Sequence, residues 1–86
     1  MNIEQIKNEL EQINSEMLAL FIRRMELVAE LGTQLAAEGK PLYDRKTEEE
    51  ILEKAVANSP MDMQNYSLEL FRAMMGYGKE YFKDKK

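Results

Sequence analysis

The chemistry open to this chain is limited to carboxylates, amines, guanidinium groups and hydroxyls. Its 86 residues include no cysteine and no histidine. Disulfides, thiolate chemistry and the common ligands of transition metals are therefore absent, and we expect no metal site. Any catalysis by this chain must use carboxylates, cations and the shape of a binding site.

Arg24 is the charged residue whose position is hardest to explain by packing alone. It falls on a stripe of apolar residues spaced three and four apart, where a leucine is expected. The apolar members of the stripe are Ile3, Ile6, Leu10, Ile13, Met17, Leu20, Leu27 and Leu31. A guanidinium on such a stripe must extend to the surface, pair with a buried carboxylate or bind an anionic ligand. The adjacent Arg23 falls off the stripe, and we expect it to point away and be solvated.

The stripe predicts a single long helix over residues 3–35. No proline or glycine occurs before Gly32. Such a helix would be about 50 Å long, whereas a compact domain of this size would be about 30 Å across. Most of the stripe therefore cannot be covered by this chain, and we expect an oligomer. Lys7 lies on a neighbouring stripe that a partner helix could cover.

Two shorter helices are predicted after the boundary formed by Gly39 and Pro41. The second helix begins at Asp44 or Thr47, both good N-caps, and ends near residues 58–60. The third begins within residues 59–62, and its methionines and aromatic residues predict core packing. Either it ends at Gly76, or its glycines admit a close neighbour. Residues 79–86, which include four lysines, are expected to fray.

Composition excludes some functions. A net charge of −4 and a pI near 4.9 argue against nucleic-acid binding, which needs a basic surface. The longest apolar run, residues 17–22, is too short to span a bilayer, so we expect no membrane partner. The first residues do not resemble a targeting signal, and a cytoplasmic location is expected. We expect residues 1–86 to form one domain.

Two segments carry most of a resemblance to a known family. LALFIRRMEL at residues 18–27 and YDRKTEEEIL at residues 43–52 resemble the all-helical (type II) chorismate mutases, and the similarity covers nearly the whole chain, including residues 66–71. The resemblance implies an all-α fold of three helices, long, short and medium, in an intertwined homodimer. It also implies the conversion of chorismate to prephenate in aromatic amino acid biosynthesis, by a pericyclic reaction that uses no cofactor.

The resemblance also assigns roles to four residues. Arg24 falls at the position of the family's central carboxylate-binding arginine. Asp44 and Glu48 fall on its acidic pair, and Glu48 is expected to accept a hydrogen bond from the substrate hydroxyl. Lys7 falls on an arginine that reaches across the dimer, keeping the charge without the forked geometry. The expected catalytic residues are Arg24 and Glu48, and all four are expected to bind the dianionic substrate.

Four other family positions are altered. They are Leu35 in place of a lysine, Thr47 in place of an arginine, Gly78 in place of a serine and Phe82 in place of a glutamine or glutamate. Leu35 and Phe82 replace both donors to the ether oxygen, and losing one such donor typically costs about 2.7–4 kcal/mol. The sequence therefore predicts weak or impaired chorismate mutase activity, unless Lys40, Arg45 or Lys46 supplies a replacement charge.

Two other interpretations stay open. One is a non-catalytic protein of the same fold that binds another small cyclic acid or a partner enzyme. The other is a purely structural helical dimer, in which Arg24 pairs with Glu48 or Asp44.

Overall fold

The first helix has the length that the apolar stripe predicts. In the computed structural model, which describes residues 1–85, α1 spans Ile3–Ala37. Asn2 caps it, because its side chain accepts the Gln5 backbone N–H at 2.8 Å while the Gln5 side chain accepts the Asn2 N–H at 2.9 Å. Gly39 follows the helix with φ 74°, the left-handed conformation that commonly ends a helix.

The second helix, α2, spans Arg45–Ala57. Asp44 is its N-cap, and its carboxylate accepts the Thr47 backbone N–H at 2.7 Å. Of the two predicted starts, Asp44 is therefore correct and Thr47 lies inside the first turn. The Asp44 carboxylate satisfies a backbone donor that the helix leaves unpaired.

The third helix does not end at Gly76, which was one of the two predicted alternatives. A short 3₁₀ helix, η1 (Met61–Met63), leads into α3 (Gln64–Lys85). The helix passes through Gly76 without interruption, and residues 79–85 are helical, so the expectation that this segment frays is wrong for them. Helices form all the regular structure of residues 1–85, which confirms the all-helical class. None of these helices combines the length and apolarity needed to cross a membrane.

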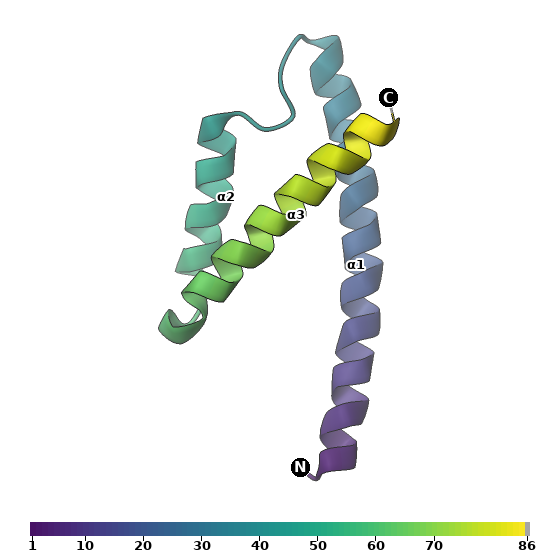
Figure 1. Cartoon of the computed structure of the whole chain (residues 1–86), viewed down its shortest axis with the longest axis vertical. Helices are drawn as coiled ribbons and strands as arrows, with labels where there is room; N and C mark the ends of the chain where they lie inside the picture. The colour runs from purple at the N-terminus through teal and green to yellow at the C-terminus, as the bar shows by residue number, and fades with distance from the viewer. Residues whose placement is uncertain (86) are drawn as a thin grey trace.

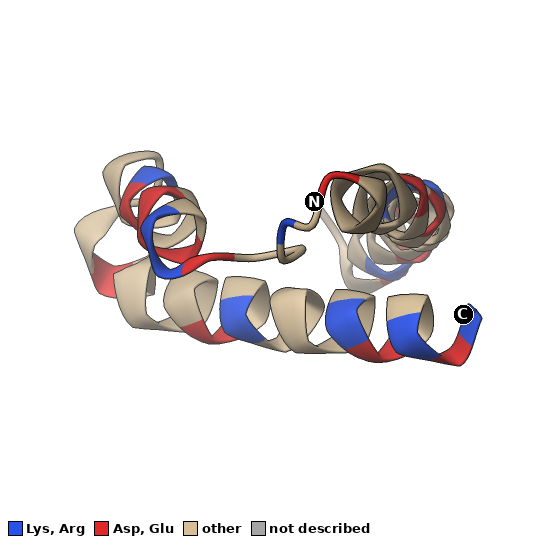
Figure 2. Cartoon of the chain, turned by 90° about the horizontal axis from the view of Figure 1, so that it is seen from above, with Lys and Arg blue, Asp and Glu red and all other residues tan. Residues whose placement is uncertain are grey.

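The three helices form two layers. α3 packs against both α1 and α2, whereas α1 and α2 make no direct helix contact with each other. Figure 1 shows α3 running diagonally between its two neighbours, and the view from above in Figure 2 places α1 and α2 on the same side of it. α3 therefore holds the two other helices side by side, joined by the loop of residues 38–44.

Two buried glycines lie where α1 and α3 pack together. A Cβ atom on Gly78 would lie 3.1 Å from Val28 Cγ1, and one on Gly32 would lie 2.8 Å from the Phe82 ring. By contrast, a Cβ on Gly76 would have no neighbour within 4 Å. The prediction of a close neighbour is thus confirmed for Gly78, while Gly76 neither ends the helix nor admits one.

Much of the apolar surface stays uncovered. The buried hydrophobic residues among those described are only Val28, Ala55 and Met75, and all of residues 1–20 are exposed. The radius of gyration is 15.8 Å, compared with about 12 Å for a compact domain of this length. The prediction that this chain cannot cover its own apolar stripe is confirmed.

Candidate functional site

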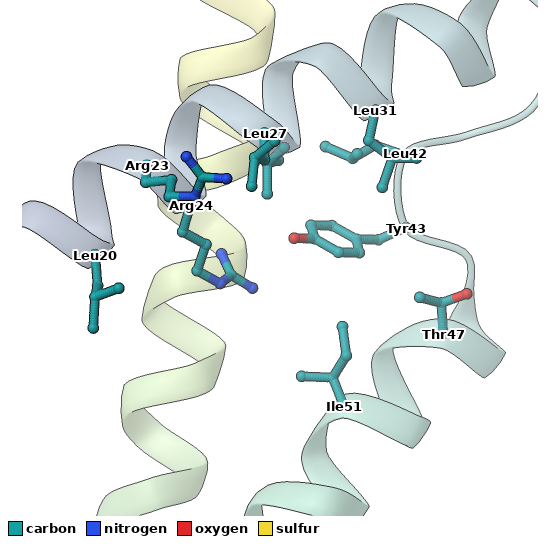
Figure 3. A pocket seen from close by; sticks show the side chains of 10 residues that line it. Leu20, Arg23, Arg24, Leu27, Leu31, Leu42, Tyr43, Thr47 and Ile51 are labelled. Atoms are coloured by element: carbon teal, nitrogen blue, oxygen red, sulfur yellow. The ribbon is translucent and has the colours of Figure 1, made fainter.

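A cavity of about 470 Å³ opens between α1 and α2, a volume within the usual range of small-molecule sites. Its walls come from the middle of α1, the loop before α2 and the first two turns of α2 (Figure 3). The lining residues are Leu20, Arg23, Arg24, Leu27, Val28, Leu31, Leu42, Tyr43, Thr47 and Ile51. Most of this surface is apolar, and two guanidinium groups stand on the α1 side.

Arg24 lines this cavity and two neighbouring hollows, and one donor of its guanidinium is unsatisfied. Its Nη1 atom is buried and has no hydrogen-bond partner in the structure. Leaving such a group unpaired is costly, and native proteins rarely do so without a functional reason. Among residues 1–85 Arg24 forms no ion pair, because the three salt bridges there join other residues. The interpretation in which Arg24 pairs with Glu48 or Asp44 is therefore wrong for this structure.

Three further polar residues line the cavity, and sequence reasoning had assigned a binding role to none of them. Arg23 is exposed as predicted, and it nevertheless lines the cavity next to Arg24. Tyr43 extends from the loop, and its hydroxyl points toward the two arginines (Figure 3). Thr47 contributes from the first turn of α2.

Glu48 is engaged by a lysine of α3. Lys79 Nζ lies 2.6 Å from Glu48 Oε1, and the same nitrogen lies 5.7 Å from the centroid of the Tyr43 ring. Glu48 does not line the cavity, although its neighbour Thr47 does. The sequence predicts that Lys79 belongs to a frayed tail. The packing of α3 against α2 is what places Lys79 next to Glu48. Both side chains are partly exposed, so we expect the pair to contribute little stability.

Asp44 performs the local task of capping α2. The hydrogen bond from the Thr47 backbone, followed by one with the Thr47 side chain, holds the pKa of Asp44 below its usual value. The nearby positive charge of Lys46 acts in the same direction. Asp44 is therefore an anion at neutral pH, fixed at the start of α2 next to Tyr43.

The other cations considered from sequence do not line the cavity. Lys7 lies in the exposed first part of α1, and nothing in this chain brings it to Arg24. Lys40 pairs with Glu38 and Arg45 pairs with Glu49, each at 3.1 Å. Lys46 is exposed. The structure thus gives no support to a rescue by Lys40, Arg45 or Lys46.

Of the four altered family positions, only Thr47 lines the cavity. The Phe82 ring packs over Gly32, Gly78 is buried against Val28, and Leu35 is half-buried near the end of α1. None of these three side chains can supply a polar group. Within residues 1–85 no cluster of three or more acidic residues is placed to hold a metal ion.

Comparison with known proteins gives one result. A family model described as chorismate mutase type II matches residues 6–83, which covers all three helices. Neither the curated proteins nor the solved structures contain a match to the chain. The match confirms the resemblance seen in the sequence, which also covers nearly the whole chain. Its extent, together with the order of long, short and medium helices, shows that the chain belongs to the chorismate mutase type II family.

Proposed function

We propose that this protein converts chorismate to prephenate. The observation that carries the proposal is the buried, unpartnered Nη1 of Arg24, a residue that lines a cavity of ligand size, in a chain of the chorismate mutase type II family. A carboxylate of the dianionic substrate would satisfy that donor. The reaction suits a chain without cysteine or histidine, because it needs no proton transfer and no nucleophile.

In this proposal the cavity acts by binding and shape. Arg24 binds one carboxylate, and the apolar walls formed by Leu27, Leu31 and Ile51 hold the ring system in the folded conformation that the rearrangement requires. Glu48 accepts a hydrogen bond from the substrate hydroxyl, for which its side chain must turn into the cavity and weaken its ion pair with Lys79. Because that ion pair is partly exposed, its disruption costs little.

We infer that turnover is slow. Negative charge that develops on the ether oxygen needs donors, and neither Leu35 nor Phe82 carries one. If the two missing donors act independently, the loss in rate would be about 10⁴–10⁶-fold. No cation of the described residues takes their place in the cavity, where the only basic residues are Arg23 and Arg24.

A second copy of the chain completes the site in this proposal. The support is the exposed stripe on α1, where Leu10 is 52% exposed and Met17 is 53% exposed. Apolar surface of this extent on a soluble helix favours pairing with another helix. In an intertwined homodimer Lys7 of one copy would reach the cavity of the other and bind the second carboxylate.

The second candidate function is binding without catalysis. It is favoured by the same absence of polar groups at Leu35 and Phe82, which leaves a site suited to holding a cyclic acid but poorly suited to stabilising a developing charge. The ligand would then be a related acid, or the protein would act on a partner enzyme.

The experiment is a chorismate consumption assay, followed by absorbance, on the unmutated chain and on Leu35→Lys. We expect slow turnover that rises in the variant as a cation is restored. No turnover in either chain, combined with stabilisation by prephenate in thermal unfolding, would support the binding function instead. No turnover and no stabilisation by prephenate would contradict the proposed activity and also the binding of an acid that resembles prephenate.

A further inference from the structure

The Tyr43 hydroxyl is an uncharged hydrogen-bond donor on the loop side of the cavity. Figure 3 shows it pointing from the loop side toward the arginine side of the cavity. Among residues 1–85 this hydroxyl makes no hydrogen bond to another group. The Tyr43 ring itself contacts the Lys79 ammonium group. A half-buried tyrosine usually finds a hydrogen-bond partner for its hydroxyl.

The ring that carries this hydroxyl is held from two sides. Lys79 Nζ lies 5.7 Å from the ring centroid on the α3 side. The hydroxyl itself lies 3.8 Å from the position that a Cβ of Gly78 would occupy, an ordinary contact distance that places it beside the buried glycine of α3. Asp44, the next residue, is fixed as the N-cap of α2. The hydroxyl is therefore a positioned group and not a freely moving one.

The Arg24 guanidinium and the Tyr43 hydroxyl thus face the same space (Figure 3). Nη1 of Arg24 is buried without a partner, whereas the Tyr43 hydroxyl is open to solvent. No carboxylate of residues 1–85 lines the cavity, so no anionic side chain among them can satisfy either donor there. A carboxylate of a ligand has two oxygens and can accept from both donors at once.

We propose that Tyr43 is a substrate-binding residue, whose hydroxyl shares one carboxylate of the substrate with Arg24. This inference rests on the proposed function for the identity of the substrate. It assigns to Tyr43 a contact made equally in the bound substrate and in the transition state, because the carboxylate does not react. Such a contact affects binding and leaves the chemical step unchanged.

The test is Tyr43→Phe, which removes only the hydroxyl and keeps the ring against Lys79. A hydrogen bond to a charged group is worth enough that we expect KM for chorismate and Kd for prephenate to rise about 10-fold, with kcat nearly unchanged. Tyr66→Phe is the matched control, because Tyr66 is 73% exposed and lies outside the cavity. The control should leave both constants unchanged, and circular dichroism should be the same for all three proteins.

Two results would overturn the assignment of Tyr43. One is unchanged KM and Kd in Tyr43→Phe. The other is a fall in kcat without a change in KM, since it would place the hydroxyl at the reacting atoms instead of the carboxylate.

Benzoate, a cyclic acid with one carboxylate, separates this inference from the proposed function. If the unmutated chain neither consumes chorismate nor binds prephenate, the proposed function fails. Benzoate binding that weakens in both Arg24→Ala and Tyr43→Phe would still support the shared carboxylate site. The shared carboxylate site would be contradicted if benzoate binding weakened only in Arg24→Ala. It would also be contradicted if the unmutated chain, inactive on chorismate, did not bind benzoate at all.

Discussion

Arg24 is the residue on which the proposed binding of an anion depends. Its guanidinium stands on an apolar helix face, and its Nη1 is buried without a partner. Because no carboxylate of residues 1–85 lines the cavity, we expect the positive charge to attract an anionic ligand. Function at this position thus conflicts with stability, since a leucine would pack on the same face without an unsatisfied donor.

This conflict makes Arg24→Leu informative. We expect the free energy of unfolding to rise by about 1 kcal/mol or more, because a buried unsatisfied donor is replaced by an apolar side chain. Chemical denaturation measures the change, and the same protein should lose prephenate binding. A variant that is less stable by a similar amount would show that Arg24 has a protein partner that compensates its charge in solution.

At the scale of the helices, α3 sets the distance between its neighbours. It contacts both α1 and α2, and the buried glycines at residues 32 and 78 allow α1 and α3 to approach closely. Lys79 adds a contact to Glu48 of α2 at 2.6 Å. The cavity between α1 and α2 therefore depends on the packing of a helix that contributes none of its lining residues.

Gly32→Ala and Gly76→Ala separate close packing from helix propensity. A Cβ at residue 32 would lie 2.8 Å from the Phe82 ring, so we expect Gly32→Ala to lower the free energy of unfolding by about 1–3 kcal/mol. A Cβ at Gly76 would meet no atom within 4 Å beyond its chain neighbours and the backbone of its own helix turn, so alanine should raise stability by up to about 1 kcal/mol. Both are measured by urea denaturation. Equal effects of the two substitutions would contradict the close approach of α1 and α3.

The parts of the fold that the sequence predicts are those with local causes. The start of α2 at Asp44 and the end of α1 before Gly39 follow from capping residues a few positions away. The contact between Lys79 and Glu48 joins residues 31 positions apart, and it depends on how α3 crosses α2. No periodicity or cap in the sequence predicts that crossing.

The residues of the candidate site also fall into those that the sequence identifies and those that only the fold reveals. Arg24 is identifiable from sequence because a charge interrupts an apolar stripe. Tyr43 gives no such signal, since a tyrosine in a connecting loop is ordinary until the loop is placed beside α1. Helical periodicity predicts that Arg23 points away from the apolar stripe. It gives the direction in which a side chain leaves the helix, and it does not account for the reach of a long, flexible side chain such as that of Arg23.

At the scale of the whole molecule, the chain has more apolar surface than it can bury. The structure extends over 53 Å in its longest dimension, and residues 1–20 of α1 are exposed throughout. A small core of this kind favours association through α1. The proposed homodimer would cover this helix and bring Lys7 to the partner's cavity.

Mixed dimers test the exchange of Lys7 between copies. We expect Lys7→Ala and Arg24→Ala each to reduce turnover strongly when assayed alone. When the two variants are unfolded together and refolded as a mixture, one site of each mixed dimer regains both residues, so activity should recover to a fraction of that of the unmutated protein. Recovery is measured against each variant refolded separately. Absence of recovery in a confirmed mixed dimer would contradict the placement of Lys7 in the partner's cavity.

The most direct measurement is the rate of prephenate formation from chorismate by the purified protein, beside Arg24→Ala and the control Arg72→Ala. Arg72 is an exposed arginine of α3 outside the cavity. We predict slow but measurable formation of prephenate that Arg24→Ala abolishes and Arg72→Ala leaves unchanged. Prephenate formation that survives in Arg24→Ala would contradict the assignment of the site, and none in the unmutated protein would contradict the proposed activity.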